Sequence, residues 1–261
     1  MIFDTHAHYD DAAFDKDRDE IFARFPDCGI GTIVDPASTW ESNWRVIKLT
    51  QKYDFLYGAL GIHPSESAGI TEEQWKEIEG NLHLSKIIAV GEIGLDYHYE
   101  EPSREWQKMV FRRQLSMARE WGLPVIIHSR DAALDTLTIL KEERAQEIGG
   151  VIHCYSYSEE LSHEFLKLGF YLGIGGVVTY KNARKVKETV KSAPMNRLVL
   201  ETDCPYLSPV PHRGERNSSL NLRYVIEEIA NLKGMTQEEV IEQTGYNALN
   251  LYPGIQNGRQ G

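Results

Sequence analysis

The sequence predicts a (β/α)8 TIM-type barrel, and three observations support this prediction. The chain has 261 residues, close to the roughly 250 that one such barrel needs. Eight short apolar runs alternate with longer amphipathic stretches, which is typical of parallel strands covered by helices. No GxGxxG motif follows the first run, so the dinucleotide-binding sheet, the main alternative with alternating elements, lacks its signature.

The eight apolar runs are expected to form the strands. They cover residues 1–4, 30–34, 55–61, 87–91, 124–127, 150–152, 170–174 and 197–201. Helices are expected at 104–121 and 183–192 and, after the last run, at about 219–232 and 237–250. Thr236 and Glu239 have the spacing of a capping box at the start of that last helix. One domain is expected over residues 1–261, with 252–261 as a loose tail.

Composition favours a soluble cytoplasmic protein. Hydrophobic residues make up 41% and charged residues 26% of the chain, with no apolar run long enough to cross a membrane. The amino terminus lacks the pattern of a signal peptide, and the three cysteines form no CxxC pair, as expected for reduced thiols. The formal net charge of −11 argues against a general nucleic-acid binder, which usually has a basic surface.

Side chains that bind metals follow the predicted strands at the points where these strands end. His6 and His8 follow the first strand, and two positions apart on an extended segment they point to the same side. The other candidates at strand ends are Glu92, His128, His153 and Asp203. Each alone would be explained as a hydrogen-bonded core histidine or an ion-paired carboxylate. Together they would meet at one end of a barrel, where a bound metal explains them all.

Six nitrogen and oxygen ligands fit two divalent ions better than one tetrahedral ion. Glu92, a carboxylate from a central strand, is predicted to bridge the two ions. Many barrels of this type use a carboxylated lysine at a strand end as the bridge, but no lysine ends the fourth strand here. His6, His8 and Asp203 would complete one site. His128 and His153 would complete the other. Ions about 3.5–4 Å apart can activate a water and clamp a phosphoryl group. The ligand types suit Zn, Mn or Co and leave Mg possible.

Six segments of the chain resemble the TatD family of metal-dependent deoxyribonucleases. They are DTHAHYD (4–10), GIHP (61–64), GEIGLDY (91–97), PVIIHSRDA (124–132), HCYS (153–156) and LETDCPYL (200–207). The resemblance spans nearly the whole chain and implies a (β/α)8 barrel, divalent metals and hydrolysis of DNA, chiefly as a 3′-exonuclease. It assigns the metal ligands to the six residues named above. Cys204 stands where family members often carry serine and is expected only to pack.

Catalytic roles are predicted for three of the polar residues. Asp203 is expected to orient the attacking hydroxide or take its proton, and Glu92 to bridge the ions. His63, after the third strand, would donate to a phosphate oxygen or protonate the leaving oxygen; alternatively, it is a loop histidine beside Pro64. Glu201, two positions before Asp203, would hold a histidine ligand from behind, or else form an ion pair inside the barrel.

Substrate contacts are predicted in the loops that follow the strands. Arg130 and Arg213 are expected to bind phosphate, since a guanidinium group pairs with it through two hydrogen bonds. Tyr97 and Tyr155 are expected to stack on a base. The alternatives are a solvated charge at Arg213 and tyrosines that pack. A small basic patch would let an acidic protein hold the end of a DNA strand, and no other partner is predicted.

Two other functions stay open on the sequence alone. The same metal site would polarise a carbonyl group, so an amidase, deacylase or lactonase acting on a small or aminoacyl substrate is possible. The acidic balance favours a small neutral substrate, whereas the family motifs and loop arginines favour DNA. The other is a non-catalytic protein that kept the fold, and the complete ligand set argues against it. The native metal, strand polarity, preference for DNA or RNA and oligomeric state are left open.

Overall fold

A computed structural model describes residues 1–257, and its strands form one parallel eight-stranded sheet in sequence order. The strands are β1 (Ile2–Asp4), β2 (Ile30–Pro36), β3 (Leu56–Leu60), β4 (Ile87–Asp96), β5 (Val125–Arg130), β6 (Gly150–Ile152), β7 (Tyr171–Ile174) and β8 (Leu198–Leu200). Each strand pairs in parallel with the next one. The predicted barrel is therefore confirmed, with one strand in each expected apolar run.

Hydrogen bonds just beyond the first and last strands join the two ends of the sheet. The N–H of Thr5 donates to the carbonyl oxygen of Leu200, and the N–H of Asp203 donates to that of His6, both at 2.9 Å. The buried carboxylate of Asp4 also accepts from the N–H (3.0 Å) and the hydroxyl (2.7 Å) of the threonine that precedes Asp203. These bonds hold His6 and Asp203 side by side.

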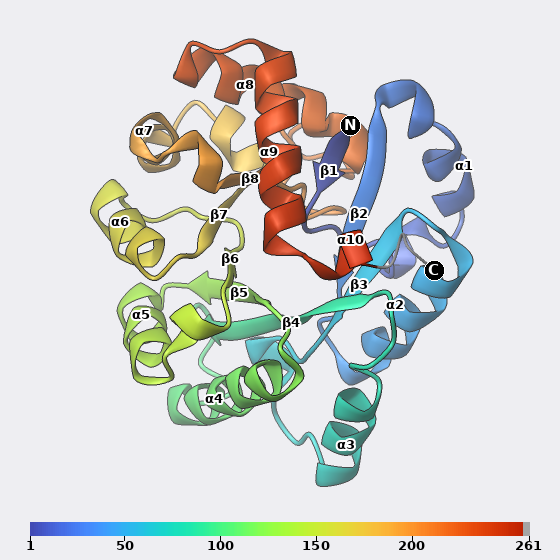
Figure 1. Ribbon diagram of the computed structural model, residues 1–261, viewed down its shortest axis with the longest axis vertical. Helices are drawn as coiled ribbons and strands as arrows, with labels where there is room; N and C mark the ends of the chain where they lie inside the picture. The colour runs from blue at the N-terminus through green and yellow to red at the C-terminus, as the bar shows by residue number, and fades with distance from the viewer. Residues whose placement is uncertain (258–261) are drawn as a thin grey trace.

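Helices surround the ring of strands (Figure 1). They are α1 (Arg18–Ala23), α2 (Trp40–Lys52), α3 (Glu72–Gly80), α4 (Arg104–Trp121), α5 (Ala133–Glu142), α6 (Glu159–Lys167), α7 (Arg184–Ser192) and α8 (Leu222–Lys233). The expected helices at 104–121 and 183–192 are present, and the one expected from 219 begins with a 3₁₀ turn, Ser219–Asn221. Within residues 1–257, no helix is both long and apolar enough to cross a membrane.

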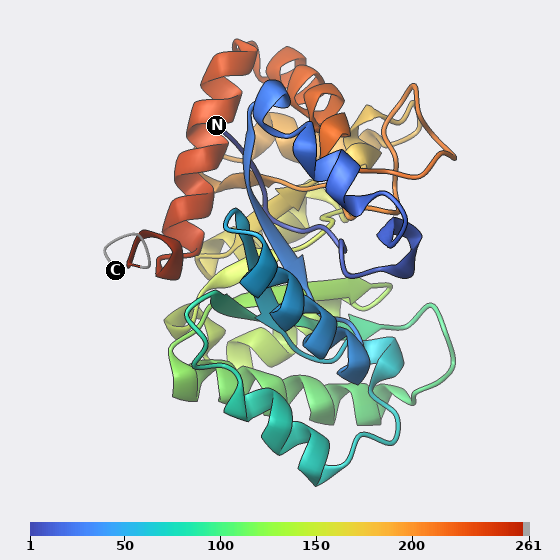
Figure 2. The ribbon, with the colours of Figure 1, turned by 90° about the vertical axis from the view of Figure 1, so that its right-hand side faces the viewer.

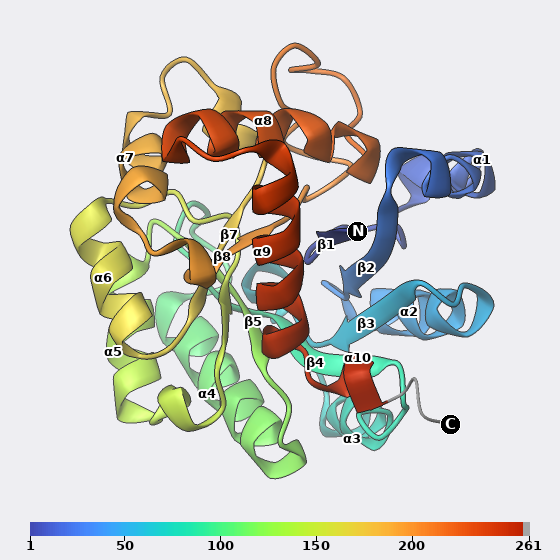
Figure 3. The same cartoon turned by 45° about the horizontal axis from the view of Figure 1, so that its top comes forward.

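Two further helices, α9 (Gln237–Leu251) and α10 (Gly254–Asn257), cover the amino-terminal end of the barrel. Helix α9 begins at the predicted capping box. It lies crosswise to α8 (Figure 3), on the side of the barrel opposite the long loops (Figure 2). The barrel residues Phe3 and Ile88 belong to one buried cluster with Tyr252 and Ile255. The barrel is thus closed at this end and open at the carboxyl ends of its strands.

The packing of the chain end corrects one prediction. Tyr252 and Ile255 were expected in a loose tail, but both side chains are fully buried under the barrel. They fill the end of the barrel, a space that no local pattern in the sequence reveals. The prediction of a loose tail is therefore wrong for Tyr252 and Ile255. The last four residues of the predicted tail, 258–261, lie outside the described part of the chain.

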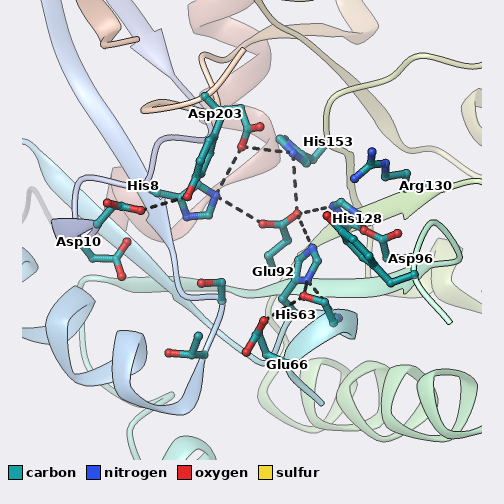
Figure 4. A pocket seen from close by; sticks show the side chains of 16 residues that line it. His8, Asp10, His63, Glu66, Glu92, Asp96, His128, Arg130, His153 and Asp203 are labelled. Atoms are coloured by element: carbon teal, nitrogen blue, oxygen red, sulfur yellow. Dashed lines mark hydrogen bonds and ion pairs between the residues drawn. The ribbon is translucent and has the colours of Figure 1, made fainter. Parts of the chain in front are cut away.

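Strand β4 is longer than its apolar run. It pairs with β5 as far as Asp96, which lies opposite Arg130, and its register shifts between Val90 and Ile93. Glu92 therefore lies inside the strand, at this irregularity, and not after its end. A bulge of this kind can turn a side chain toward a site, and here the carboxylate of Glu92 reaches the centre of the open end (Figure 4).

Candidate metal centre

The six predicted ligands meet at the open end of the barrel. His6 and His8 follow β1, Glu92 lies in β4, His128 in β5, His153 follows β6 and Asp203 follows β8. All but His6, which is fully buried, line a cavity of about 350 Å³. Figure 4 shows Glu92 in the middle, with His8 on one side and His128 on the other.

The first group of ligand atoms comes from His6, His8 and Asp203, with one oxygen of Glu92 beside them. The Nε2 atom of His6 lies 3.0 Å from Nε2 of His8, 3.3 Å from Oε2 of Glu92 and 3.6 Å from Oδ1 of Asp203. Nε2 of His8 lies 3.6 and 3.4 Å from the same two oxygens. Ligands at about 2.0–2.2 Å from a tetrahedral ion are about 3.3–3.6 Å apart. The atoms of His6, His8 and Asp203 therefore lie close enough together to hold one ion, and Oε2 of Glu92 lies beside both histidines.

The second group gathers at Oε1, the other carboxylate oxygen of Glu92. Nδ1 of His128 lies 2.8 Å from it, and Nε2 of His153 and Nε2 of His63 each lie 3.8 Å from it. The two histidines expected here thus both face Oε1, and His63 lies beside them; Nε2 of His153 is also 3.6 Å from Oδ1 of Asp203 in the first group. Glu92 turns one oxygen to each group, as a carboxylate that bridges two ions must.

The two carboxylates among the ligands have lowered pKa values. Burial alone would raise the pKa of Glu92, but the neighbouring His6 and His153 outweigh burial and hold this pKa well below its usual range. Burial also acts to raise the pKa of Asp203, which His153 and His8 nevertheless keep lowered. Both carboxylates are therefore ionised, which is the form that binds metal. Imidazole and carboxylate donors suit Zn, Mn or Co, as expected from the sequence.

Glu201 lies directly behind one ligand. Its Oε1 atom is 3.2 Å from Nδ1 of His153 and accepts a 2.6 Å hydrogen bond from the N–H of Cys154. Glu201 is fully buried, and Nε2 of His153 lies 3.8 Å from Oε1 of Glu92 and 3.6 Å from Oδ1 of Asp203. The predicted contact with a histidine ligand is therefore present as a close approach, although Nδ1 of His153 makes no hydrogen bond within residues 1–257.

We expect the Glu201→Gln variant to bind metal and turn over substrate about 10–100-fold less well, the usual effect of changing a group that holds a ligand. The amide carries no charge to attract the Nδ1 proton of His153, so the ring is held less firmly. Competition with a chelator measures the metal affinity. Glu227→Gln, the same change at an exposed position, is the control. Equal metal affinity in both variants would mean that Glu201 only forms an ion pair inside the barrel and does not support metal binding by His153.

Two features of the site were not predicted from the sequence. Asp96, at the end of β4, has its Oδ2 atom 3.1 Å from Nε2 of His128. Its position four residues after Glu92, on the same side of a regular strand, could have revealed it. Asp35 and Asp10 form a buried acidic group beside His8. Burial, and then Asp10, raise the pKa of Asp35 well above its usual range, and within residues 1–257 neither of its oxygens has a hydrogen-bond partner.

The structure places only one of the four predicted loop contacts at the cavity. Arg130 lines it, whereas Arg213 lies over the ring of Tyr180, 4.5 Å from its centre. The hydroxyl of Tyr97 donates to Asp135 at 2.7 Å, and this ring does not line the cavity.

Tyr155 corrects a further prediction. It is buried, and its ring packs edge-on against Phe165 while its hydroxyl donates to the carbonyl oxygen of Ser158 at 2.5 Å. Its N–H donates to the carbonyl oxygen of Gly173, which fixes the backbone so that the ring enters the core. Tyr155 is therefore a packing residue and cannot stack on a base.

A barrel with this ring of ligands at the carboxyl ends of its strands has the architecture of a metal-dependent hydrolase. The family model described as TatD related DNase matches residues 3–253. The chain therefore belongs to the TatD family of metal-dependent hydrolases, and the resemblance seen in the sequence is confirmed.

Individual relatives agree with this assignment. The chain is 44% identical over 252 residues to the uncharacterized metal-dependent hydrolase YabD of Bacillus subtilis (strain 168), covering 97% of this chain and 99% of the relative. It is 34% identical to the uncharacterized metal-dependent hydrolase YcfH of Escherichia coli (strain K12), covering 97% of this chain and 96% of the relative. The crystal structure of YjjV, a TatD homolog from E. coli K12, superposes with a TM-score of 0.91 at 31% identity, with 97% and 98% covered.

Proposed function

We propose that this protein hydrolyses phosphodiester bonds of DNA, removing nucleotides from the 3′ end of a strand with two divalent ions. The observation that carries the proposal is the position of Glu92, which presents one oxygen to each of two ligand groups. When bound, such a pair of ions lowers the pKa of a water molecule and stabilises the charge on a phosphoryl group. The family description, TatD related DNase, supports DNA as the substrate.

The ligands divide into two sets around Glu92. His6, His8 and Asp203 would hold the first ion with Oε2. His128 and His153 would hold the second with Oε1. The Asp203 side chain is 17% exposed, more than that of His6 or His8. It lines the cavity, which supports the proposal that one of its carboxylate oxygens takes a proton from the attacking water.

His63 is suited to bind phosphate. Its Nδ1 atom accepts a 3.2 Å hydrogen bond from the N–H of Ser65, so the ring proton is on Nε2, which faces the second ligand group. Burial, with help from the neighbouring His128, lowers the pKa of His63 to about 3. A neutral imidazole of this tautomer donates a hydrogen bond to a phosphate oxygen. We therefore propose the first of its two predicted roles, binding phosphate, for His63.

Binding of DNA should itself depend on the metal. The carboxylates that line the cavity are Asp10, Asp11, Glu66, Glu92, Asp96 and Asp203, and Arg130 is the one arginine or lysine among its lining residues. Without cations these carboxylates repel a phosphate group. We expect an oligonucleotide with an uncleavable phosphorothioate end to lose binding when the protein is chelated, measured by fluorescence anisotropy. Unchanged binding by the chelated protein would show that the DNA-binding site lies outside this cavity.

The proposal is tested with one DNA strand labelled in two ways. Single-stranded oligonucleotides labelled at the 5′ or the 3′ end are incubated with chelated protein and then with added Mg, Mn or Zn. We expect metal-restored shortening: a ladder from the 5′-labelled strand, early release of the 3′ label, and neither with His128→Ala. Cleavage that begins at the 5′ end would overturn the proposed polarity.

A second candidate is a small-molecule ester or amide hydrolase, because the acidic lining of the cavity favours a neutral substrate. Chelated and metal-restored protein is therefore also given ester and amide model substrates. Metal-dependent hydrolysis of these, without any shortening of DNA, would replace the nuclease proposal by this one.

A further inference from the structure

Two exposed tyrosines stand at the cavity. Tyr99 is 57% and Tyr206 55% exposed. Of the large apolar side chains that are exposed within residues 1–257, these two line the metal cavity. Tyr99 belongs to the loop between β4 and α4, and Tyr206 to the loop that follows β8. In a ring of eight strands in sequence order, β4 and β8 lie opposite each other. The two rings therefore approach the cavity from opposite sides.

Contacts within the protein hold both rings but leave much of each exposed. The hydroxyl of Tyr206 donates to Oδ2 of Asp11 at 3.1 Å, and its N–H donates to the carbonyl oxygen of Asp203 at 2.9 Å. The ring of Tyr99 meets that of His98 edge-on and has the guanidinium of Arg130 5.9 Å from its centre. The ring of Tyr206 is thus held beside the loop that carries Asp203. The ring of Tyr99 lies near Arg130.

We propose that Tyr99 and Tyr206 form a stacking clamp for unpaired nucleobases at the end of a DNA strand. The clamp rests on the proposed nuclease function and adds to it a site that recognises bases. Stacking suits this cavity because it provides affinity without positive charge, where carboxylates far outnumber Arg130. It accepts any base, since every base has an aromatic face. The clamp also selects single-stranded ends, because paired bases are already stacked on their neighbours.

The test compares two substrates of equal charge. One is a single-stranded oligonucleotide, and the other is the same strand with abasic deoxyribose at its last positions. We expect Tyr99→Leu and Tyr206→Leu each to raise KM for the normal strand about tenfold, in the range for loss of one stacked base, with kcat nearly unchanged. For the abasic strand, KM should be the same in these variants and the wild type.

Two further variants make the result specific. Tyr206→Phe loses the bond to Asp11 but keeps the ring, so it should retain the wild-type KM. Tyr246→Leu makes the same change at an exposed tyrosine of α9, at the closed end of the barrel, and should also leave KM unchanged.

The outcomes separate the clamp from the nuclease function. Active Leu variants of Tyr99 and Tyr206 with wild-type KM for the normal strand would overturn the clamp and leave the nuclease function standing. An equal rise in KM for the abasic strand would overturn it as well, because the rings would then act on the backbone. A wild-type protein that cleaves neither strand would overturn both proposals.

Discussion

The Glu92→Gln variant should fail to hold two ions and should cleave phosphodiester bonds more than about a hundredfold more slowly, beyond the range seen when a group behind a ligand is changed. Each carboxylate oxygen of Glu92 faces its own set of histidines, at 3.3 Å from His6 and 2.8 Å from His128. Glutamine replaces one of these oxygens with an NH₂ group, which cannot bind a cation. It also removes a negative charge that the buried imidazoles face.

Metal content after gel filtration, measured by mass spectrometry, and initial rates on a labelled oligonucleotide check this expectation. Glu66→Gln is the matched control, because Glu66 lines the same cavity but belongs to neither ligand group. It should keep both ions and most of the activity. A Glu92→Gln protein that retains two ions per chain would show that another group bridges them.

The Asp203→Asn variant should separate metal binding from turnover. His6, His8 and Glu92 remain to hold the first ion, and the second set of ligands is intact. Asparagine cannot accept a proton from the attacking water, so we expect kcat to fall by about 10²–10⁴-fold, the usual contribution of a general base. The loss should be in kcat more than in KM.

The measurement is steady-state kinetics at saturating metal, together with the number of bound ions. Asp131→Asn provides a control, since Asp131 is exposed next to Arg130 and does not line the cavity. Full activity in Asp203→Asn would remove this residue from the catalytic step. Loss of both ions would mean that its main role is to hold metal.

The barrel was predictable because parallel strands buried on both faces appear as unbroken apolar runs, such as 30–34 and 124–127. The carboxyl ends of such strands meet at one end of the barrel, so residues that follow different runs are neighbours. This rule predicted that His6 and His153 would meet, whereas Glu92 joins them from inside β4, at its register shift. The contact of Glu201 with His153 was likewise predictable, from its position two residues before a ligand.

What the sequence could not supply depends on backbone geometry outside regular elements. Beyond a strand end, the alternation of side chains no longer holds, so Tyr155 entered the core while Tyr99 and Tyr206 stayed exposed at the cavity. The apolar run that ends at Gly91 hid the rest of β4, because polar and glycine residues continue the pairing to Asp96.

A bridge between two metal ions through Glu92 is tested most directly by titrating the chelated protein with Mn(II), followed by electron paramagnetic resonance. A carboxylate bridge couples the two ions magnetically. We predict that the signal saturates at two Mn(II) per chain and shows the spectrum of a coupled pair, which is lost in Glu92→Gln. Saturation at one ion, or two ions with the spectrum of isolated Mn(II), would contradict the account.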